Sequence, residues 1–256
     1  MYFQENIWMM EKIFHLSDKA LIHMVNHLFR TEYSDEETIL KEWNHQEPVS
    51  VWLTIGCANR YMFQLRCLEG CIQIYAEDRG CMFQYGSPAE NTIVQMREPQ
   101  IIYFGKNRKE EYCTTLEFPG HERITLPIHI ITLSECSAKK LEDSGLILFL
   151  PFLFHCFAEE SAKTERKQEF LKYFMIHDIV GTLNLSLRKG DLTVFDVQKL
   201  KQFCRQMVWR MFAQEPWMQD LELQELILEI FETDLDLLER VQRLEIQRIQ
   251  NKQMKI

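Results

Sequence analysis

The sequence VSVWLTIGCANRYMFQLR, residues 49–66, contains two apolar runs, Val49 to Ile55 and Tyr61 to Leu65, with a short connection between them. The two runs predict the strands of a β-hairpin. Alternate side chains of a strand lie on the same face of a sheet, so a hairpin can present two carboxylates and a cation together. Such a group could hold Mg²⁺, and the hairpin is therefore the first candidate for a metal-dependent site.

Helical patterns lie on both sides of this hairpin. The segment Ile7 to Phe29 carries apolar residues at helical intervals, and Ser17 with Asp18 can restart a helix within it as N-terminal caps. After the hairpin, Leu68 to Tyr85 predicts a helix, although it contains two glycines that each cost up to about 1 kcal/mol relative to alanine.

Three further β-rich runs follow, namely Pro99 to Phe104, Tyr112 to Phe118 and Ile124 to Leu133. Pro119-Gly120 is a turn dipeptide between the second and the third run. The order of strands, helix and strands predicts an α/β fold with a mixed sheet flanked by helices, rather than a β-sandwich.

The remainder of the chain is predicted to be helical. A long amphipathic helix over Ser161 to Leu187 is closed by Gly190. Thr193, with Asp196 three residues later, has the spacing of a capping box for a helix that ends near residue 212. The simplest division is an α/β domain over residues 1–145, a helical region over 146–219 and a final amphipathic helix over 220–256.

The final helix carries a seven-residue apolar repeat. Its two seams contain Leu223, Ile230, Leu237 and Leu244, and Ile227 with Val241. This pattern is typical of a short coiled coil, so the chain could form a homo-oligomer through residues 220–256. Packing of the same seams against the chain's own helical bundle is the alternative.

Composition limits the function. The formal net charge of −9 disfavours broad electrostatic attraction to nucleic acid, whose binding depends on Lys and Arg. Local basic clusters are Lys106, Arg108 and Lys109, and Lys163, Arg166 and Lys167; each also fits solvated surface charge. The first ten residues lack a secretory pattern, and the longest apolar run, Leu146 to Phe157, is too short to cross a bilayer. A cytoplasmic protein that does not enter a membrane is predicted.

Cysteines and histidines give no metal motif. The eight cysteines form no C-x-x-C pair and lie mostly among apolar neighbours, which favours reduced, buried thiols over zinc ligands. His23 and His27 are four residues apart on a predicted helix, a ligand-capable spacing. Without an H-E-x-x-H pattern, a packed or surface pair is favoured.

One resemblance covers the whole chain. It rests on short stretches in a fixed order: Lys12-Ile13-Phe14, Asn26 to Phe29, the hairpin, Arg79 with Phe83 to Tyr85, Pro99 to Phe104, Phe118-Pro119-Gly120, Leu126-Pro127-Ile128, Leu150-Pro151-Phe152 and the turn from Gly190 to Asp196. The chain resembles the PD-(D/E)xK nuclease family of transposase-associated, recombination-promoting proteins of bacteria. The resemblance implies a restriction-endonuclease-like mixed sheet, DNA as the substrate and Mg²⁺ as the cofactor of an active member.

The same resemblance implies that the catalytic motif is degenerate. An Asp is expected on the first hairpin strand, at about Val51, and a Glu-x-Gln or Glu-x-Lys on the second, at Gln64-Leu65-Arg66. Val cannot ligate Mg²⁺, Gln offers only a neutral carbonyl, and Arg66 places a positive charge where the ion would lie. We therefore expect no resident metal unless acids are relocated.

Two alternatives remain open for this site. The nearby acids Glu47, Glu69, Glu77 and Asp78, the last two on the predicted helix, could form a relocated site and an active DNA endonuclease. Otherwise Arg66 and Arg79 could bind an anion such as a backbone phosphate, because Arg presents a planar donor fork. The sequence thus predicts a weak or inactive nuclease relative, an active endonuclease with relocated acids, or a non-enzymatic oligomeric interaction protein.

Overall fold

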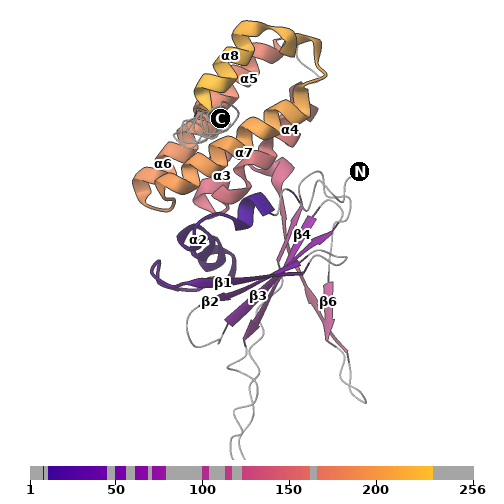
Figure 1. Cartoon of the computed structure of the whole chain (residues 1–256). Coiled ribbons are helices and arrows are strands. Elements are labelled where there is room, and N and C mark those ends of the chain that lie inside the picture. The colour runs from indigo at the N-terminus through magenta and orange to yellow at the C-terminus, as the bar shows by residue number, and fades with distance from the viewer. Residues whose placement is uncertain are drawn as a thin grey trace, which may run out of the picture.

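The chain is a mixed α/β protein in which a sheet precedes a set of helices (Figure 1). The structure is a computed structural model that describes residues 8, 11–44, 50–55, 61–68, 71–78, 100–103, 113–116, 123–161 and 166–232. In Figure 1 the helices α3 to α8 form the upper part, the strands form the lower part, and α2 lies at the junction between them.

Helix α2, Asp18–Phe29, confirms the predicted restart. The Ser17 hydroxyl accepts a hydrogen bond from the main-chain N–H of Ala20, which satisfies one of the donors left free at a helix start. One face of α2 is buried, including Leu21 and Val25. The helix ends at Arg30, which adopts a left-handed conformation with φ of 51°.

The main sheet has six strands in the order β1-β2-β3-β4-β5-β8. These strands are β1 Ile39–Asn44, β2 Ser50–Ile55, β3 Tyr61–Leu68, β4 Cys71–Asp78, β5 Gln100–Tyr103 and β8 His129–Thr132. Neighbours from β1 to β5 are antiparallel, and β8 runs parallel to β5. A separate antiparallel pair is formed by β6, Cys113–Leu116, and β7, Ile124–Pro127.

The predicted hairpin is confirmed as β2 and β3, and the run from Pro99 to Phe104 is confirmed as β5. The helix predicted over Leu68 to Tyr85 is wrong for residues 71–78, which form β4; residues 79–85 lie outside the described residues. The sequence CIQIYAED places Ile72, Ile74 and Ala76 at every second position, and Ile74 is fully buried. This period of two favours a strand over the helix.

Two other strand predictions need correction. The run Ile124 to Leu133 is not one strand, because β7 pairs with β6 whereas β8 pairs with β5 in the main sheet. Strand β1 was not predicted, since its stretch is acidic and polar. Only its alternate positions face the core: Ile39 is buried and Trp43 packs against the core at its edge.

The C-terminal helices follow the predicted order closely. They are α3 Ala138–Asp143, a 3₁₀ segment Ile147–Phe152, α4 Leu153–Ser161, α5 Lys167–Tyr173, a π-helical segment Phe174–Val180, α6 Gly181–Lys189, α7 Val194–Phe212, a 3₁₀ segment Pro216–Gln219 and α8 Leu221–Ile230. The helix predicted from Ser161 thus begins at Lys167, after α4 has ended.

Three predicted helix boundaries are confirmed by their caps, whereas the helix predicted over residues 220–256 is wrong in its length, because α8 ends at Ile230. Gly190 closes α6 with φ of 83°, and Thr193 with Asp196 forms the capping box of α7. Asp220 caps the start of α8 through its side chain. These local signals were reliable because each satisfies main-chain groups at a helix end.

One continuous hydrophobic core contains side chains from both sides of the predicted boundary at residue 145, such as Val51 of β2 and Phe149 of the first 3₁₀ segment. It also contains Leu223 and Ile227 of α8, both fully buried. These two seam residues therefore pack within their own chain. Leu237, Val241 and Leu244 lie outside the described residues.

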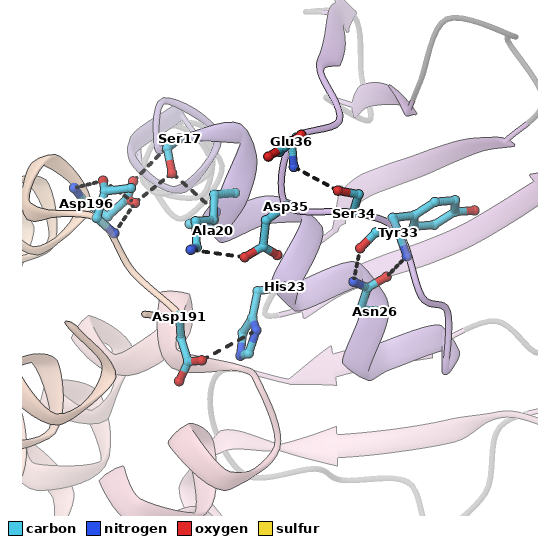
Figure 2. A network of polar contacts seen from close by, with 12 residues as sticks. Ser17, Ala20, His23, Asn26, Tyr33, Ser34, Asp35, Glu36, Asp191 and Asp196 are labelled. Carbon is cyan, nitrogen blue, oxygen red and sulfur yellow. Dashed lines mark hydrogen bonds and ion pairs between the residues drawn. The ribbon is translucent and has the colours of Figure 1, made fainter. Parts of the chain in front are cut away.

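A polar junction joins α2 to the loop between α6 and α7 (Figure 2). The buried Asp196 accepts hydrogen bonds from the main-chain N–H of Ser17 at 2.7 Å and from its hydroxyl at 2.6 Å. It also accepts from the main-chain N–H and hydroxyl of Thr193, at 2.9 and 2.6 Å. One carboxylate thus anchors the starts of two helices.

No helix in the described part of the chain is long and apolar enough to cross a membrane.

Candidate functional site

The backbone register of the β2–β3 hairpin places the predicted site residues. Val51 pairs with Leu65, Trp52 pairs with Gln64 and Ser50 pairs with Arg66. Residues directly opposite each other on neighbouring strands belong to the same face of a sheet, and successive residues alternate between faces. The register positions of Gln64 and Arg66 therefore lie on one face, and that of Val51 lies on the other.

Val51 lies on the face that is packed against the core. It is 0% exposed, and Leu53 and Ile55, the next residues on this face of β2, are also buried. A metal ion cannot be held jointly by positions on opposite faces of one sheet. The structure thus does not bring Val51 together with Gln64.

The positions around Gln64 are occupied by residues without carboxylates. Trp52 and Tyr75 are its direct neighbours on β2 and β4, and Arg66 lies between Ser50 and Gln73 in the same way. No acid therefore stands directly opposite Gln64 on either neighbouring strand.

Of the possible substitute acids, Glu77 and Asp78 are located on β4, so their predicted place on a helix is wrong. Glu77 pairs with Met62, which puts it on the face of Gln64 and diagonal to it, about 7–8 Å away between Cα positions. Asp78 pairs with Tyr61 and belongs to the opposite face. Glu47, Glu69 and Arg79 lie outside the described residues and stay predictions.

A large cavity lies elsewhere, on the helix-covered side of the sheet. It has a volume of about 630 Å³ and lies between the end of α2, strand β5, the β7–β8 junction and the turn after α3. Its lining includes His27, Arg30, Gln100, Pro127 and Ser144. None of the described residues that line it carries a carboxylate.

Two basic residues at the end of α2, His27 and Arg30, line this cavity. His27 Nδ1 lies 3.0 Å from the main-chain oxygen of His23; because that oxygen only accepts, Nδ1 donates and Nε2 of a neutral ring is an acceptor. Arg30 is exposed and forms no ion pair with any residue that the structure describes.

The ring of His27 fills the space that a side chain at position 145 would occupy. A Cβ atom at Gly145 would lie 2.2 Å from His27 Cγ, and the φ of +67° is in the left-handed region that favours glycine. The cavity therefore depends on a glycine at the turn after α3.

The chemistry of this cavity suits an anion better than a metal. It offers a guanidinium, an imidazole, an amide and a hydroxyl, whereas Mg²⁺ requires several anionic or carbonyl oxygens. Sequence reasoning missed Arg30, since nothing in the sequence sets it apart from any arginine at a helix end. The one signal was its position three residues after His27, which predicts a shared helix face.

The histidine pair is packed, as the sequence favoured. The rings of His23 and His27 have centroids 4.3 Å apart, and His23 Nδ1 lies 3.9 Å from an oxygen of Asp191 (Figure 2). Burial lowers the pKa of His23, and the charge of Asp191 opposes this effect. No group of three potential metal ligands occurs among the residues that the structure describes.

The described cysteines, Cys113, Cys136, Cys156 and Cys204, form no disulfide with one another. Burial is confirmed for Cys204 and is wrong for Cys113, which is exposed because β6 lies in the small two-stranded sheet outside the core.

Arg166, from the second basic cluster, is exposed and lies 3.9 Å from Glu169. Such an exposed pair contributes little to stability.

Comparisons of the chain with models of protein families, with curated proteins and with solved structures found no match.

Proposed function

We propose that this chain is a PD-(D/E)xK nuclease relative with a restriction-endonuclease-like sheet, which binds DNA through its phosphates and does not cleave it efficiently. The observation that carries the proposal is the β2–β3 register. It puts the position expected for the first catalytic acid into the hydrophobic core, and it puts no acid directly opposite Gln64.

Loss of cleavage follows from ligand chemistry. Mg²⁺ keeps near-octahedral geometry and is usually bound through one or two carboxylates. On the face of Gln64, β4 offers one carboxylate position, Glu77, and it is diagonal rather than opposite. Arg66 at the neighbouring position adds a positive charge, which further disfavours a cation.

Binding of phosphate is supported by Arg30. Its guanidinium has no ion-pair partner in the described structure and stands at a cavity with no carboxylate in its lining. Since the net charge is −9, attraction to DNA must come from such local groups rather than from the whole surface. We therefore expect weak binding with a small dependence on salt.

A plasmid assay tests the cleavage half of the proposal. Supercoiled plasmid incubated with the protein and either Mg²⁺ or Mn²⁺ should remain supercoiled. Robust nicking that is lost in Glu77→Gln would instead support an active endonuclease with relocated acids. Nicking that persists in Glu77→Gln would also overturn the proposal, and would direct attention to Glu47 or Glu69.

DNA binding is tested by fluorescence anisotropy with a labelled duplex at two salt concentrations. Arg30→Ala should weaken binding by about tenfold, the loss of one charge-assisted hydrogen bond. Arg188→Ala removes the same charge from the exposed end of α6 and is the matched control. Equal effects of both variants, or no binding by the unmodified chain, would contradict the proposal.

Self-association through α8 is a second candidate function. Leu221 and Leu228 are 72% and 48% exposed and are seven residues apart, so they form an apolar stripe that is separate from the buried seam. Sedimentation velocity of Leu221→Glu/Leu228→Glu tests it without opening the core, in contrast to deletion of residues 220–256. A monomer for both the variant and the unmodified chain would dismiss this function.

A further inference from the structure

A second cavity lies within the helical part of the chain, away from the hairpin and from Arg30. Its volume is about 360 Å³, within the range of small-molecule sites. It is enclosed by residues 134–138 at the start of α3, by α4, and by α5 with the π-helical segment that follows it.

An aromatic wall forms one side of this cavity. The rings of Phe157 and Phe170 are stacked with centroids 5.0 Å apart, and those of Phe157 and Phe174 are stacked at 5.1 Å. Phe157 is buried, whereas Phe170 is 41% exposed. A large apolar side chain that remains so exposed beside a cavity offers its ring to a further partner.

The helix register brings an acid into line with these rings. Phe170, Phe174 and Asp178 follow one another at intervals of four residues, and all three line the cavity. In a continuous α-helix, positions four apart drift steadily around the axis. The wider π turn over Phe174–Val180 counters that drift, and π segments are frequent at functional sites.

The charged groups of the lining are all acidic. Asp178 and Glu135 line the cavity, and no Lys, Arg or His does among the residues that the structure describes. Asp178 forms no hydrogen bond or ion pair with another described residue. Partial burial raises the pKa of Asp178, and the charge of His177 opposes that effect. When a carboxylate has lost part of its hydration without gaining a partner, a cation that binds beside it stabilises its charged form.

We propose that this cavity binds a small organic cation, a primary or quaternary amine with an apolar body. The carboxylates of Asp178 and Glu135 attract the charge, and the faces of Phe170 and Phe174 stabilise it through cation–π contact. The apolar body of the ligand is accommodated by Leu153 and by the two thiols of the lining, Cys136 and Cys156.

Choline is a suitable probe because 3,3-dimethylbutan-1-ol has the same shape without the charge. Calorimetry with the full chain should detect choline at millimolar concentration and a weaker response to the neutral alcohol. Asp178→Asn should weaken choline binding by about tenfold, the equivalent of one charged contact. Asp143→Asn removes an exposed carboxylate at the far end of α3 and should leave binding unchanged.

The two cysteines of the lining provide an independent readout. Choline should slow alkylation of Cys136 and Cys156 by N-ethylmaleimide, measured by peptide mass spectrometry, and should not affect Cys113 on β6. This readout works even if calorimetric heats are small. Phe170→Ala should reduce the protection, because it removes the exposed ring of the wall.

Three results would overturn the proposal. The first is no heat and no protection of the thiols by choline up to tens of millimolar. The second is equal binding of choline and its neutral analogue, which would make the cavity merely apolar. The third is an equal loss of binding in Asp178→Asn and Asp143→Asn, which would reflect general surface charge.

Discussion

Asp196 of α7 and Asp178 of the π-helical segment are carboxylates whose surroundings differ. Asp196 is 0% exposed and accepts hydrogen bonds from the main chain and hydroxyl of both Ser17 and Thr193. Asp178 is half-buried, accepts none from the described residues and faces a cavity. A buried charge whose acceptor sites are filled by the protein stabilises the fold, whereas one whose sites are left open is available to a ligand.

The largest loss of stability is expected for a new carboxylate that has no hydrogen-bond donors around it. Val51→Asp would place one in the core, and we expect it to cost more than about 4 kcal/mol, enough to unfold many domains. Val51→Ala, which removes volume without adding charge, should cost about 2 kcal/mol. Urea denaturation followed by circular dichroism measures both. If Val51→Asp is as stable as Val51→Ala, this position is not the core position described above.

Removal of the satisfied carboxylate should be the next largest effect. Asp196→Ala leaves the N–H groups of Ser17 and Thr193 without their acceptor, and we expect a loss of about 3 kcal/mol in the free energy of unfolding. Asp220→Ala removes a carboxylate that caps only α8 and should cost about 1 kcal/mol. Similar losses for the two variants in urea titrations would mean that the link to Ser17 contributes nothing.

His23 provides a titration in which burial is the largest influence on the pKa. Because burial lowers its pKa in the folded chain below the usual 6.5, the unfolded chain binds a proton more readily. Stability is therefore fully present above pH 6.5 and falls as the pH drops from there through the folded-state pKa. His23→Gln should remove this slope in unfolding titrations between pH 7.5 and 5.5. An unchanged slope would assign it to other groups.

Asp178→Asn should have the smallest effect on stability, and it should raise stability rather than lower it. Its raised pKa means that the folded chain holds the proton more tightly, so this group destabilises the fold as the pH rises above about 3.8. The variant should be more stable by a few tenths of a kcal/mol near pH 7, and equal to the unmodified chain at pH 3. A clear loss of stability at pH 7 would show that Asp178 is satisfied after all, like Asp196.

The two carboxylates also differ in what the sequence reveals. The spacing of Thr193 and Asp196 predicted the capping box, because a cap involves residues three apart. The bond from Ser17 to the same Asp196 depends on tertiary packing and has no local signal. The cavity around Asp178 also has no local signal in the sequence. Its walls come from three separate segments, and no residue pattern marks the π turn that aligns them.

In the sheet, the apolar pattern predicted the strands that are mostly apolar and missed strands that mix apolar with charged residues. The hairpin was predicted from two apolar runs, whereas β1 and β4 each contain two consecutive charged residues and were missed. The degenerate motif at Gln64 and Arg66 could be read from the sequence. That Val51 lies on the opposite face could not, because a register shift of one residue reverses the faces and only the pairing of the strands fixes it.

The bond between Ser17 and Asp196 also bears on the order in which the chain can fold during synthesis. The two residues are 179 positions apart, so the partner that completes the start of α2 leaves the ribosome only after the whole sheet has been made. Contacts this distant in sequence form late, because a long loop must close before they stabilise anything. Helix α2 therefore lacks this contact until the start of α7 has been made, and a ribosome that stalls before residue 196 leaves α2 without its anchor.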